Sequence, residues 1–483
     1  MKITDLQPKL VWECFDLITK VPRPTHHLDK MKEFLVSWAE SHKIPVSTDE
    51  VGNVVMRKPA TPGHENAPVV ILQGHQDMVA EKNPDKTHDF LNDPITTIVE
   101  GDWVRADGTT LGADNGLGCA TAMAVLLDDN LVHGPIEALF TVDEEQGLIG
   151  ANGLQPGFVT GSILLNLDSE EHGQLVIGCA GGKVTICSKA VTFADADQTK
   201  AYYKVAVSNF KGGHSGMEIH LGRGNANQQL ARFLVSVWEK YSLVLSSFDG
   251  GGLANAIPRE AEAVVGIDSS KKQEFENDVR VFSDMLHAEF LLSEGNDFSF
   301  TAEETKIPEK VFSGDEGENL VKAIFSCPNG VQGMSNAVEG LVETSCNLAS
   351  VKIYNNIVTV TDHQRSSVDS RRDEIADRVK SLFSIIGYKA EFDDAYVGWA
   401  PNPDSKVLGV AKESFKSLFG KEPKVEALHA GLECGLFLEK MPELDMISFG
   451  PTLKDIHSPN EKANISSVAE FWRFLCEILR RLA

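Results

Sequence analysis

Groups that can bind a metal ion or transfer a proton follow the first strongly apolar segment of the chain. Residues 69–72 are all apolar and predict a buried strand, and His75 and Asp77 come directly after it. In an extended chain these two side chains lie on the same face. A metal-binding imidazole needs a carboxylate partner that orients it, and Asp77 could be that partner for His75. Taken alone, a His-x-Asp pair is more typical of an ordinary ion pair, so evidence for a metal site must come from the rest of the chain.

Two further apolar segments also end in acidic residues. Residues 136–142 predict a strand that is followed by Glu144 and Glu145, and residues 162–167 predict another that is followed by Asp168. Neighbouring carboxylates repel one another unless a cation lies between them. A solvated loop would weaken that repulsion, so this pattern favours a cation site without requiring one.

A glycine-rich turn places one more acid at the start of a helix. Asp114 is the charged residue of the turn 112–118, which leads into the apolar helix expected at 119–128. Glycine allows unusual backbone angles and the close approach of other atoms. Asp114 could equally be a helix N-cap. Far along the chain, His457 lies in a polar loop and is a candidate only if that loop reaches the same place.

Alternating strands and helices indicate how these residues could meet. The pattern predicts an α/β fold whose catalytic domain has a mainly parallel, doubly wound sheet. In such sheets ligands bind beyond the carboxyl ends of the strands, so the acidic clusters would face one crevice. From about residue 189 the pattern changes to strands with one wet face, which predicts an α+β domain with an antiparallel sheet. We therefore expect catalytic segments at 1–188 and 400–483, with 189–399 as an inserted domain.

Composition limits the possible functions. The chain has 483 residues, more than one hydrophobic core usually contains, and its formal net charge is −25. This charge argues against nucleic acid and anionic membranes as partners. No apolar run is long enough for a transmembrane helix, and the start of the chain lacks a signal-peptide core. The eight cysteines form no C-x-x-C pair, which fits reduced thiols and a cytoplasmic location.

The candidate residues together predict a two-metal hydrolase. Imidazoles and carboxylates without thiolates suit divalent zinc, cobalt or manganese, and a single ion would leave some of the ligands unexplained. With two ions one carboxylate must bridge, and Asp114 is the most approachable. Two such ions produce a hydroxide nucleophile and polarise a carbonyl, while Glu144 could transfer the proton. Amide hydrolysis fits better than phosphoester hydrolysis, because the chain shows no phosphate-binding glycine loop. The predicted ligands are His75, Asp114, Glu145, Asp168 and His457.

The motifs resemble those of the M20 family of metallopeptidases, in the same order and over essentially the whole chain. They are GHQD at 74–77, GADNG at 112–116, DEEQG at 143–147, LD at 167–168 and the late His457. The branch of the family that the chain resembles most is that of the aminoacyl-histidine dipeptidases. The similarity rests on the long insertion, the GHQDM motif and HAGLECG at 429–435.

This resemblance implies roles for the individual residues. His75 and Asp168 would hold one ion, Glu145 and His457 the other, with Asp114 bridging. Asp77 would orient His75, and Glu144 would act as general base and acid towards a water or hydroxide between the ions.

The resemblance also implies a substrate-binding lid. His214 would support the oxyanion, Asn255 would contact the substrate, and Arg365, a looser match, would bind its carboxylate. Closure of such a lid would expel water from the site. Residues 189–399 could also serve dimerisation, and a homodimer is expected, although long-lidded members can supply the lid histidine internally, which leaves a monomer open.

The expected reaction is hydrolysis of dipeptides, with a preference for Xaa-His, including the β-alanyl-histidine type. A deacylase or a broader aminopeptidase on the same scaffold is the alternative among hydrolases. The alternative that is not an enzyme is a regulatory relative that binds metal without catalysing a reaction. It is disfavoured because Glu144, which such a protein would not need, stands beside Glu145.

Overall fold

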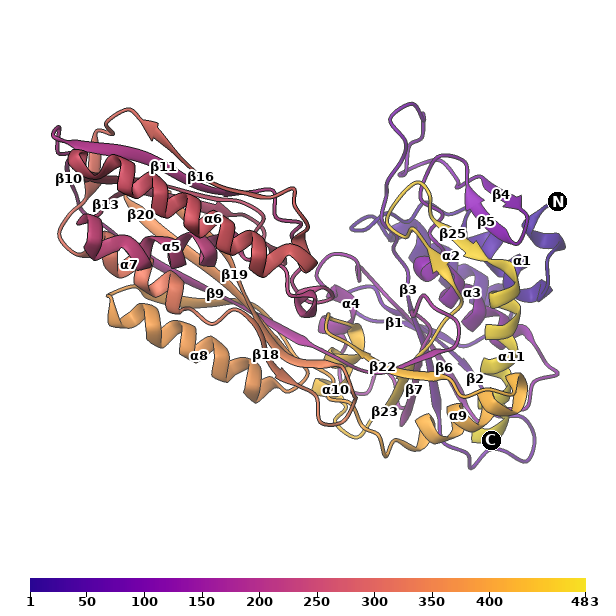
Figure 1. The fold of residues 1–483 in the computed structure, drawn as a ribbon. Helices are drawn as coiled ribbons and strands as arrows, with labels where there is room; N and C mark the ends of the chain where they lie inside the picture. Colours follow the sequence, from indigo (N-terminus) through magenta and orange to yellow (C-terminus); the bar gives the residue numbers. More distant parts are fainter. The chain divides into compact units, whose positions relative to one another are not determined.

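The chain forms two compact units. The computed structural model describes residues 1–483 with the exception of residue 394. Unit 1 comprises Met1–Gly178, Pro401–Ala427 and Leu432–Ala483, and unit 2 comprises Cys179–Ala400 and Leu428–Gly431 (Figure 1). The expectation of a mixed α/β protein with several sheets is confirmed.

The division between the units falls earlier than the expected boundary at 188/189. Strand β9 (Gly181–Ala190) would be cut by that boundary, yet it pairs along its length with β20 (Ile357–Ser366) of unit 2. The four residues Leu428–Gly431 also join unit 2, although the segments on either side belong to unit 1.

Unit 1 is built on an eight-stranded sheet of mixed direction. Its strand order is β1-β2-β6-β3-β7-β23-β8-β22. The neighbours β6, β3, β7 and β23 run parallel, whereas β1, β2 and β8 pair antiparallel at either side. Every residue of β3, β6 and β7 is buried, which explains why apolar residues predominate in them. The strands are β1 (Val46–Thr48), β2 (Val54–Lys58), β3 (Val70–His75), β6 (Ile136–Thr141), β7 (Ile163–Asn166), β8 (Gln174–Cys179), β22 (Lys424–Leu428) and β23 (Asp445–Ser448).

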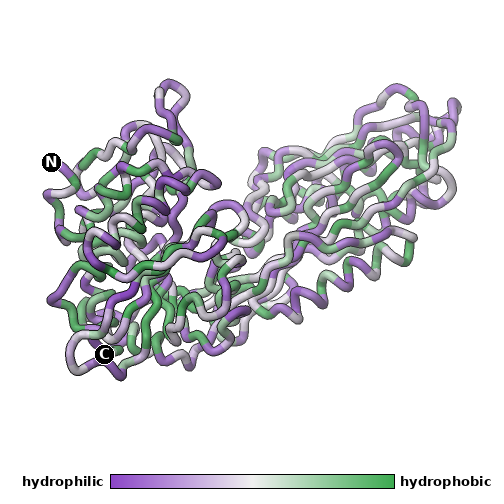
Figure 2. Tube along the Cα trace, turned by 180° about the vertical axis from the view of Figure 1, so that it is seen from behind, coloured by the Kyte–Doolittle hydropathy of each residue, from purple (hydrophilic) through white to green (hydrophobic). Residues whose placement is uncertain are grey.

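The helices of unit 1 bury their apolar faces. In the last helix Val468, Phe471, Leu475 and Ile478 recur at spacings of three and four residues and are all buried. Hydrophobic residues are correspondingly frequent in the interior of this unit (Figure 2). None of the helices in the described part of the chain combines the length and apolar character needed to cross a membrane. The helices are α1 (Lys9–Ile18), α2 (Asp29–Ser41), α3 (Ala113–Leu127), α4 (Ile149–Gly153), α9 (Lys406–Phe419), α10 (Glu433–Lys440) and α11 (Ile465–Leu482).

The segment 80–110 contains two short strands. These are β4 (Thr97–Glu100) and β5 (Trp103–Ala106), and β5 pairs with β25 (Lys462–Asn464) in a small sheet that also includes β24 (Leu453–Lys454). Strands of four residues carry too little periodicity to be recognised from sequence. Through this sheet the chain near His457 is tied to the first half of unit 1.

Unit 2 is an antiparallel sheet with helices. The strand order is β16-β11-β15-β13-β19-β20-β9-β21, with β18 paired to β19. The buried residues of α5 and α6 pack with those of the sheet in one hydrophobic core, which includes Phe233, Phe275 and Phe300. The strands and helices not yet given are β10 (Phe193–Asp195), β11 (Lys200–Ser208), β12 (Gly213–His214), α5 (Ala226–Tyr241), β13 (Val244–Gly251), β14 (Ala256–Ile257), β15 (Ala261–Asp268), α6 (Lys272–Glu294), β16 (Ser299–Thr305), β17 (Lys310–Phe312), α7 (Glu316–Ser326), β18 (Gly330–Met334), β19 (Val342–Tyr354), α8 (Asp369–Ile385) and β21 (Lys389–Tyr396).

Candidate metal centre

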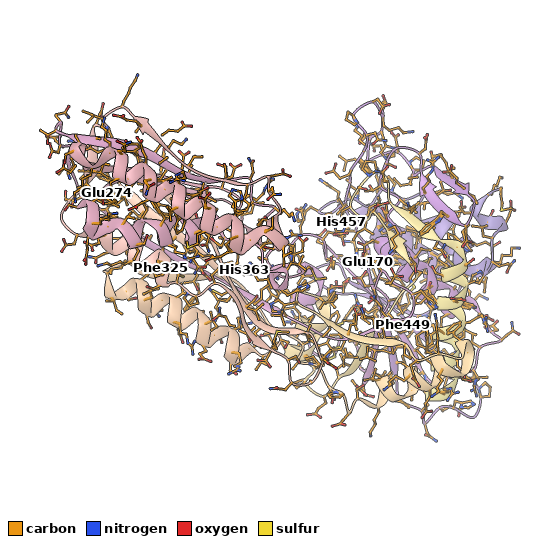
Figure 3. All side chains as sticks on the ribbon, in the orientation of Figure 1. Glu170, Glu274, Phe325, His363, Phe449 and His457 are labelled. Carbon is orange, nitrogen blue, oxygen red and sulfur yellow. The ribbon has the colours of Figure 1, made fainter. Side chains whose placement is uncertain are left out.

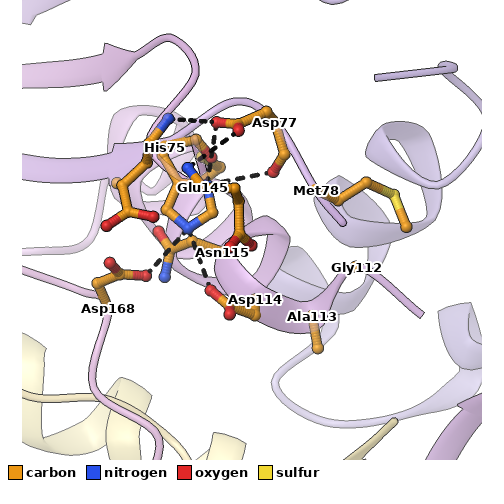
Figure 4. Close-up of polar contacts among 12 residues, drawn as sticks. His75, Asp77, Met78, Gly112, Ala113, Asp114, Asn115, Glu145 and Asp168 are labelled. Carbon is orange, nitrogen blue, oxygen red and sulfur yellow. Dashed lines mark hydrogen bonds and ion pairs between the residues drawn. The ribbon is translucent and has the colours of Figure 1, made fainter. Parts of the chain in front are cut away.

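His75 stands at the centre of the acidic cluster in unit 1. It is the last residue of β3 and is 1% exposed. Its Nε2 lies 3.1 Å from Oδ1 of Asp114 and 3.4 Å from Oδ1 of Asp168, while Nδ1 lies 3.3 Å from Oδ1 of Asp77 (Figure 4). The parallel strands β3 and β7 are neighbours, so Asp168, two residues after β7, reaches the same edge of the sheet as His75.

His457 joins the cluster from the far end of the sequence. Its Nε2 lies 3.1 Å from Oδ2 of Asp114 and 3.0 Å from Oε2 of Glu145. The two oxygens of Asp114 therefore face two different imidazoles, those of His75 and His457. Glu170 lies on the same side of unit 1 as His457 (Figure 3). Burial, with the charges of Asp114 and Asp168, raises the pKa of Glu170 to about 7.

Asp77 connects His75 to the loop that carries the two glutamates. Its carboxylate accepts hydrogen bonds from the backbone N–H of Glu144 at 3.0 Å and of Glu145 at 3.3 Å. It also accepts one from the hydroxyl of Thr25 at 3.0 Å. The same carboxylate thus orients His75 and fixes the backbone at the end of β6.

The turn before α3 is held by a residue from the other end of the chain. The carboxylate of Glu461 accepts hydrogen bonds from four successive backbone N–H groups, those of residues 111–114, at 2.7 to 3.2 Å. Gly112 adopts φ +67°, and a Cβ there would lie 2.5 Å from the guanidinium of Arg23. Glycine is therefore required, because both the backbone angle and the space exclude a side chain. Arg23 itself donates to the carbonyls of residues 76, 77 and 112.

The cluster carries more negative charge than its own residues neutralise. Burial alone would lower the pKa of His75, but Asp168, Asp114 and Asp77 outweigh it and raise that pKa well above its usual value. Hydrogen bonds to Asp114 and Glu145 raise the pKa of His457 to about 10. Burial, with the repulsion of Asp114 and Glu145, raises the pKa of Asp168 to about 6. Each of these shifts means that the cluster favours additional positive charge.

The donor set fits divalent cations. His75, Asp114 and Asp168 form one group, and Asp114, Glu145 and His457 form another, with the ligand atoms of each group within 4.8 Å of one another. Asp114 belongs to both. The buried oxygens Oε1 of Glu145 and Oδ1 of Asp168 have no hydrogen-bond partner among the described residues. Oxygens of this kind are satisfied when they coordinate a metal.

Glu144 stands beside these ligands in a different environment. It groups with His75 and Glu145 but not with Asp114 or His457. Burial raises its pKa well above the usual value, and the negative charges of Asp168 and Glu145 act in the same direction. A carboxyl group with a raised pKa is suited to accept and return a proton near neutral pH.

The residues expected on the lid all lie in unit 2. His214 accepts hydrogen bonds at Nδ1 from the backbone N–H groups of Gly216 and Met217, so its proton is on Nε2. Burial and the neighbouring Arg365 lower the pKa of His214, which keeps the ring neutral. His214 pairs with Ala256 across strands β12 and β14. Asn255, which is exposed, directly precedes Ala256 and therefore lies beside His214.

Arg365 is buried within unit 2 and has no acidic partner among the residues that the structure describes. It is 4% exposed and donates from Nη1 to the hydroxyl of Tyr396 at 2.9 Å. Its Nε has no hydrogen-bond partner, and no carboxylate forms an ion pair with it, among the residues that the structure describes. His429, which belongs to unit 2 and hydrogen-bonds Ser345 at 2.6 Å, also lies near this guanidinium.

Several of these residues were given no role by the sequence. Arg23, Glu461 and Tyr396 act through contacts with distant parts of the chain, and only the position of Glu461, four residues after His457, offered a signal. Glu433 stood in the HAGLECG motif, which had suggested a branch of the family without indicating what the residue does.

Comparison with known proteins identifies the family. A family model described as peptidase family M20/M25/M40 matches residues 71–481. The chain belongs to this family. The M20 resemblance is thereby confirmed, and with it the prediction that the protein is a peptidase and so a hydrolase.

Two relatives match this M20 chain along its whole length. It is 41% identical over 484 residues to the cytosol non-specific dipeptidase of Escherichia coli (strain K12), covering 100% of this chain and 99% of the relative. It is also 41% identical to the crystal structure of aminoacylhistidine dipeptidase from Vibrio alginolyticus, with a TM-score of 0.95 over 100% of this chain and 98% of that one. The aminopeptidase PepT of Bacillus cereus ATCC 10987 shares the fold, with a TM-score of 0.57, 15% identity and 99% of both chains covered.

Proposed function

We propose that this M20 peptidase is a dipeptidase that works with two divalent metal ions bound in unit 1. The observation that carries the proposal is the position of Asp114, whose two oxygens each lie 3.1 Å from a different imidazole, His75 and His457. A carboxylate in that position can bridge two ions, each of which also has one histidine.

The remaining ligands divide between the two ions. His75 and Asp168 would bind the first ion, and Glu145 and His457 the second, because each pair groups with Asp114. The set contains nitrogen and oxygen donors only, which suits zinc and also accepts cobalt or manganese. We propose zinc as the usual metal.

The residues around the ions then have distinct tasks. When bound, a pair of divalent ions lowers the pKa of water and polarises a carbonyl. Asp77 keeps His75 in one orientation through Nδ1. Glu144 accepts the proton of the attacking water and delivers it to the amine nitrogen of the leaving amino acid. Its raised pKa suits both steps, since the group must be a base first and an acid afterwards.

Unit 2 would act as the lid of this peptidase, with unit 1 as the catalytic domain. His214 offers a neutral Nε2–H donor, which can stabilise negative charge on the oxygen of the scissile carbonyl. Arg365 offers a buried guanidinium that has no acidic partner among the described residues and can bind the carboxylate of a dipeptide. Asn255 is proposed as a further substrate contact next to His214. We also propose that the chain works as a homodimer, with a monomer as the alternative.

The names of the two relatives support dipeptides as substrates, but they indicate different specificities. One is called non-specific and the other aminoacylhistidine dipeptidase. We propose a preference for Xaa-His dipeptides, including the β-alanyl-histidine type, within a broader dipeptidase activity. The first name also supports a cytosolic location.

The proposal is tested with the protein stripped by chelation and reloaded with zinc, manganese or cobalt. The substrates are Xaa-His dipeptides, dipeptides with other C-terminal residues, a tripeptide and an N-acetyl amino acid. We expect dipeptides to be hydrolysed fastest, Xaa-His first among them, with two ions per chain at full activity. Sedimentation of the same samples measures the oligomeric state.

Each other result points to a named alternative. Tripeptide cleavage as fast as dipeptide cleavage would favour a broader aminopeptidase, and fast release of acetate would favour a deacylase. Tight binding of two ions without hydrolysis of any substrate in the panel would refute the peptidase assignment at this site.

A further inference from the structure

A layer of buried polar side chains crosses the sheet of unit 1 directly behind the metal ligands. Asn166 donates to Gln73 at 2.5 Å, and Gln73 donates to the carboxylate of Glu433 at 2.6 Å. Thr141 donates to the same Glu433 oxygen, Oε2, at 2.9 Å, and Ser448 donates to Asn166. All five side chains are at most 1% exposed. Such a layer inside an otherwise apolar sheet needs an explanation, because buried polar groups cost free energy unless each is hydrogen-bonded.

The layer has a fixed relation to the ligands. Gln73 precedes His75 by two residues on β3, so both side chains are on the same face of the sheet. Thr141 ends β6 opposite His75, three residues before Glu144. Asn166 ends β7 opposite Gln73, two residues before Asp168. Each of the three neighbouring strands therefore has one polar side chain in the layer and a member of the candidate site just beyond it.

Glu433 is the one member of the layer that comes from a helix. It is the first residue of α10, and its Oε2 is shared by donors from β3 and β6. The last backbone bond between these strands runs from the N–H of Gln76 to the carbonyl of Thr141 at 2.8 Å. Beside it, the shared buried acceptor joins the side chains of the two strand ends and helps to fix their separation. Metal ligands need that control, because ligand distances must be held to within about 0.2 Å.

We propose that Glu433 is a positioning residue for the metal centre, which holds the ends of β3 and β6 at the separation that the two ions require. The inference rests on the proposed two-metal site and extends it to a residue that touches neither ion nor substrate.

The charge state of Glu433 agrees with this role. Burial raises its pKa to about 8, which favours the neutral carboxylic acid in the metal-free protein at neutral pH. Its Oε2 accepts two hydrogen bonds, which leaves the proton on Oε1, an oxygen without a partner among the described residues. A glutamine offers the same acceptor and an N–H donor in place of the acid proton. The position therefore requires a shared acceptor of this shape, not a negative charge.

The test compares Glu433→Gln with Glu433→Leu in the full-length chain. Three readouts are used: the affinity of each ion by calorimetry, the visible absorption of the cobalt-loaded protein, and the melting temperature of the metal-free protein. We expect Glu433→Gln to keep the wild-type affinities and cobalt spectrum. Glu433→Leu removes the acceptor that Gln73 and Thr141 share and leaves only the weaker contacts from Gln73 to Thr141 at 3.1 Å and from Thr141 to the carbonyl of Gly74 at 3.4 Å. This variant should lower the affinity for at least one ion by about tenfold to a hundredfold, with a changed spectrum. Thr141→Val, a milder change, should shift the same readouts in the same direction.

Glu137 provides the matched control. It is a buried carboxyl on β6 at the opposite end of the strand, where it accepts hydrogen bonds from the backbone of Thr160 and Gly161. Glu137→Leu should lower the melting temperature and leave metal affinity and the cobalt spectrum unchanged.

The outcomes separate this inference from the proposed function. The inference is overturned if Glu433→Leu and Thr141→Val behave like Glu137→Leu, or if Glu433→Gln loses metal as severely as Glu433→Leu. If the wild type binds two ions but hydrolyses no dipeptide, the proposed function fails while the role of Glu433 is still decided by the metal titrations.

Discussion

The ligand cluster of unit 1 and the cluster around Arg365 in unit 2 place histidines in opposite electrostatic environments. Hydrogen bonds to Asp114 and Glu145 raise the pKa of His457 to about 10. Burial, together with the charge of Arg365, lowers the pKa of His429 to about 3. The same side chain thus favours its charged form in one unit and its neutral form in the other.

The difference shows what each region still needs. Unit 1 has buried carboxylate oxygens of Glu145 and Asp168 that accept no hydrogen bond from the described residues, so its acidic cluster favours cations. In unit 2 no carboxylate among the described residues forms an ion pair with the buried guanidinium of Arg365, which under the proposed function would bind an anion such as a peptide carboxylate. A charge imbalance of either sign inside a protein is costly unless a ligand compensates it. The following predictions test this contrast.

The largest effect is expected from Asp114→Asn. An amide cannot bridge two cations as a carboxylate can, so the variant should lose its metal on dialysis and with it all turnover. Elemental analysis of metal per chain measures this directly. Asp249→Asn, which changes an exposed acid paired with Lys352 in unit 2, should retain full metal content. Two ions retained by Asp114→Asn would exclude a bridging role.

Glu144→Gln should separate chemistry from metal binding. The two ions should persist, because Glu144 is not among the proposed ligands, while kcat falls by about 10²- to 10⁴-fold with the loss of proton transfer. Glu145→Gln is the control and should lose metal. If Glu144→Gln loses metal as well, the division of labour between the two glutamates is wrong.

Arg365→Ala tests the other side of the comparison. Metal content should be unchanged, and kcat/KM for a dipeptide should fall about tenfold to a hundredfold, mainly through KM, because one charged hydrogen-bonding partner is lost. The wild type should be similarly slow on a dipeptide whose C-terminal carboxylate is amidated, and the variant should lose little more on that substrate. Equal rates of the wild type on acid and amide would contradict the assignment.

The smallest effect is a difference in the pH dependence of stability. An unfolded histidine takes up its proton near pH 6.5, whereas His429 in the folded protein resists protonation down to about pH 3. The contribution of the neutral His429 ring to the free energy of unfolding is therefore fully present above pH 6.5, and it is lost as the pH falls below that value. The contribution has a limiting slope of about 1.4 kcal/mol per pH unit.

Urea unfolding of the metal-free protein between pH 7 and pH 4 measures that slope. His429→Gln keeps a hydrogen-bonding side chain but cannot titrate, so its stability should vary less with pH than that of the wild type. Parallel curves for the two proteins would show that His429 is not held neutral.

The sequence indicated the candidate ligands because chemistry and strand pattern coincide in short segments. His75 and Asp168 follow apolar runs that are buried strands, and the parallel pairing of β3 with β7 brings them to one edge. The positions that sequence did not explain depend on contacts across the chain. Glu461 binds the turn at Leu111 from 350 residues away, and Glu433 bonds Gln73 from 360 residues away.

By itself, the sequence determined which residues could bind metal, which family the chain resembles and that it alternates strands and helices. Those are local properties, since residue type and a period of two or 3.6 residues can be read from neighbouring positions. Only the tertiary structure decided that Asp114 lies between His75 and His457 and that Glu433 shares its oxygen with two strands. It also decided that Arg365 is buried, with no acid beside it in the described part of the chain. These depend on strand order and on how distant segments pack, and local periodicity carries no information about either.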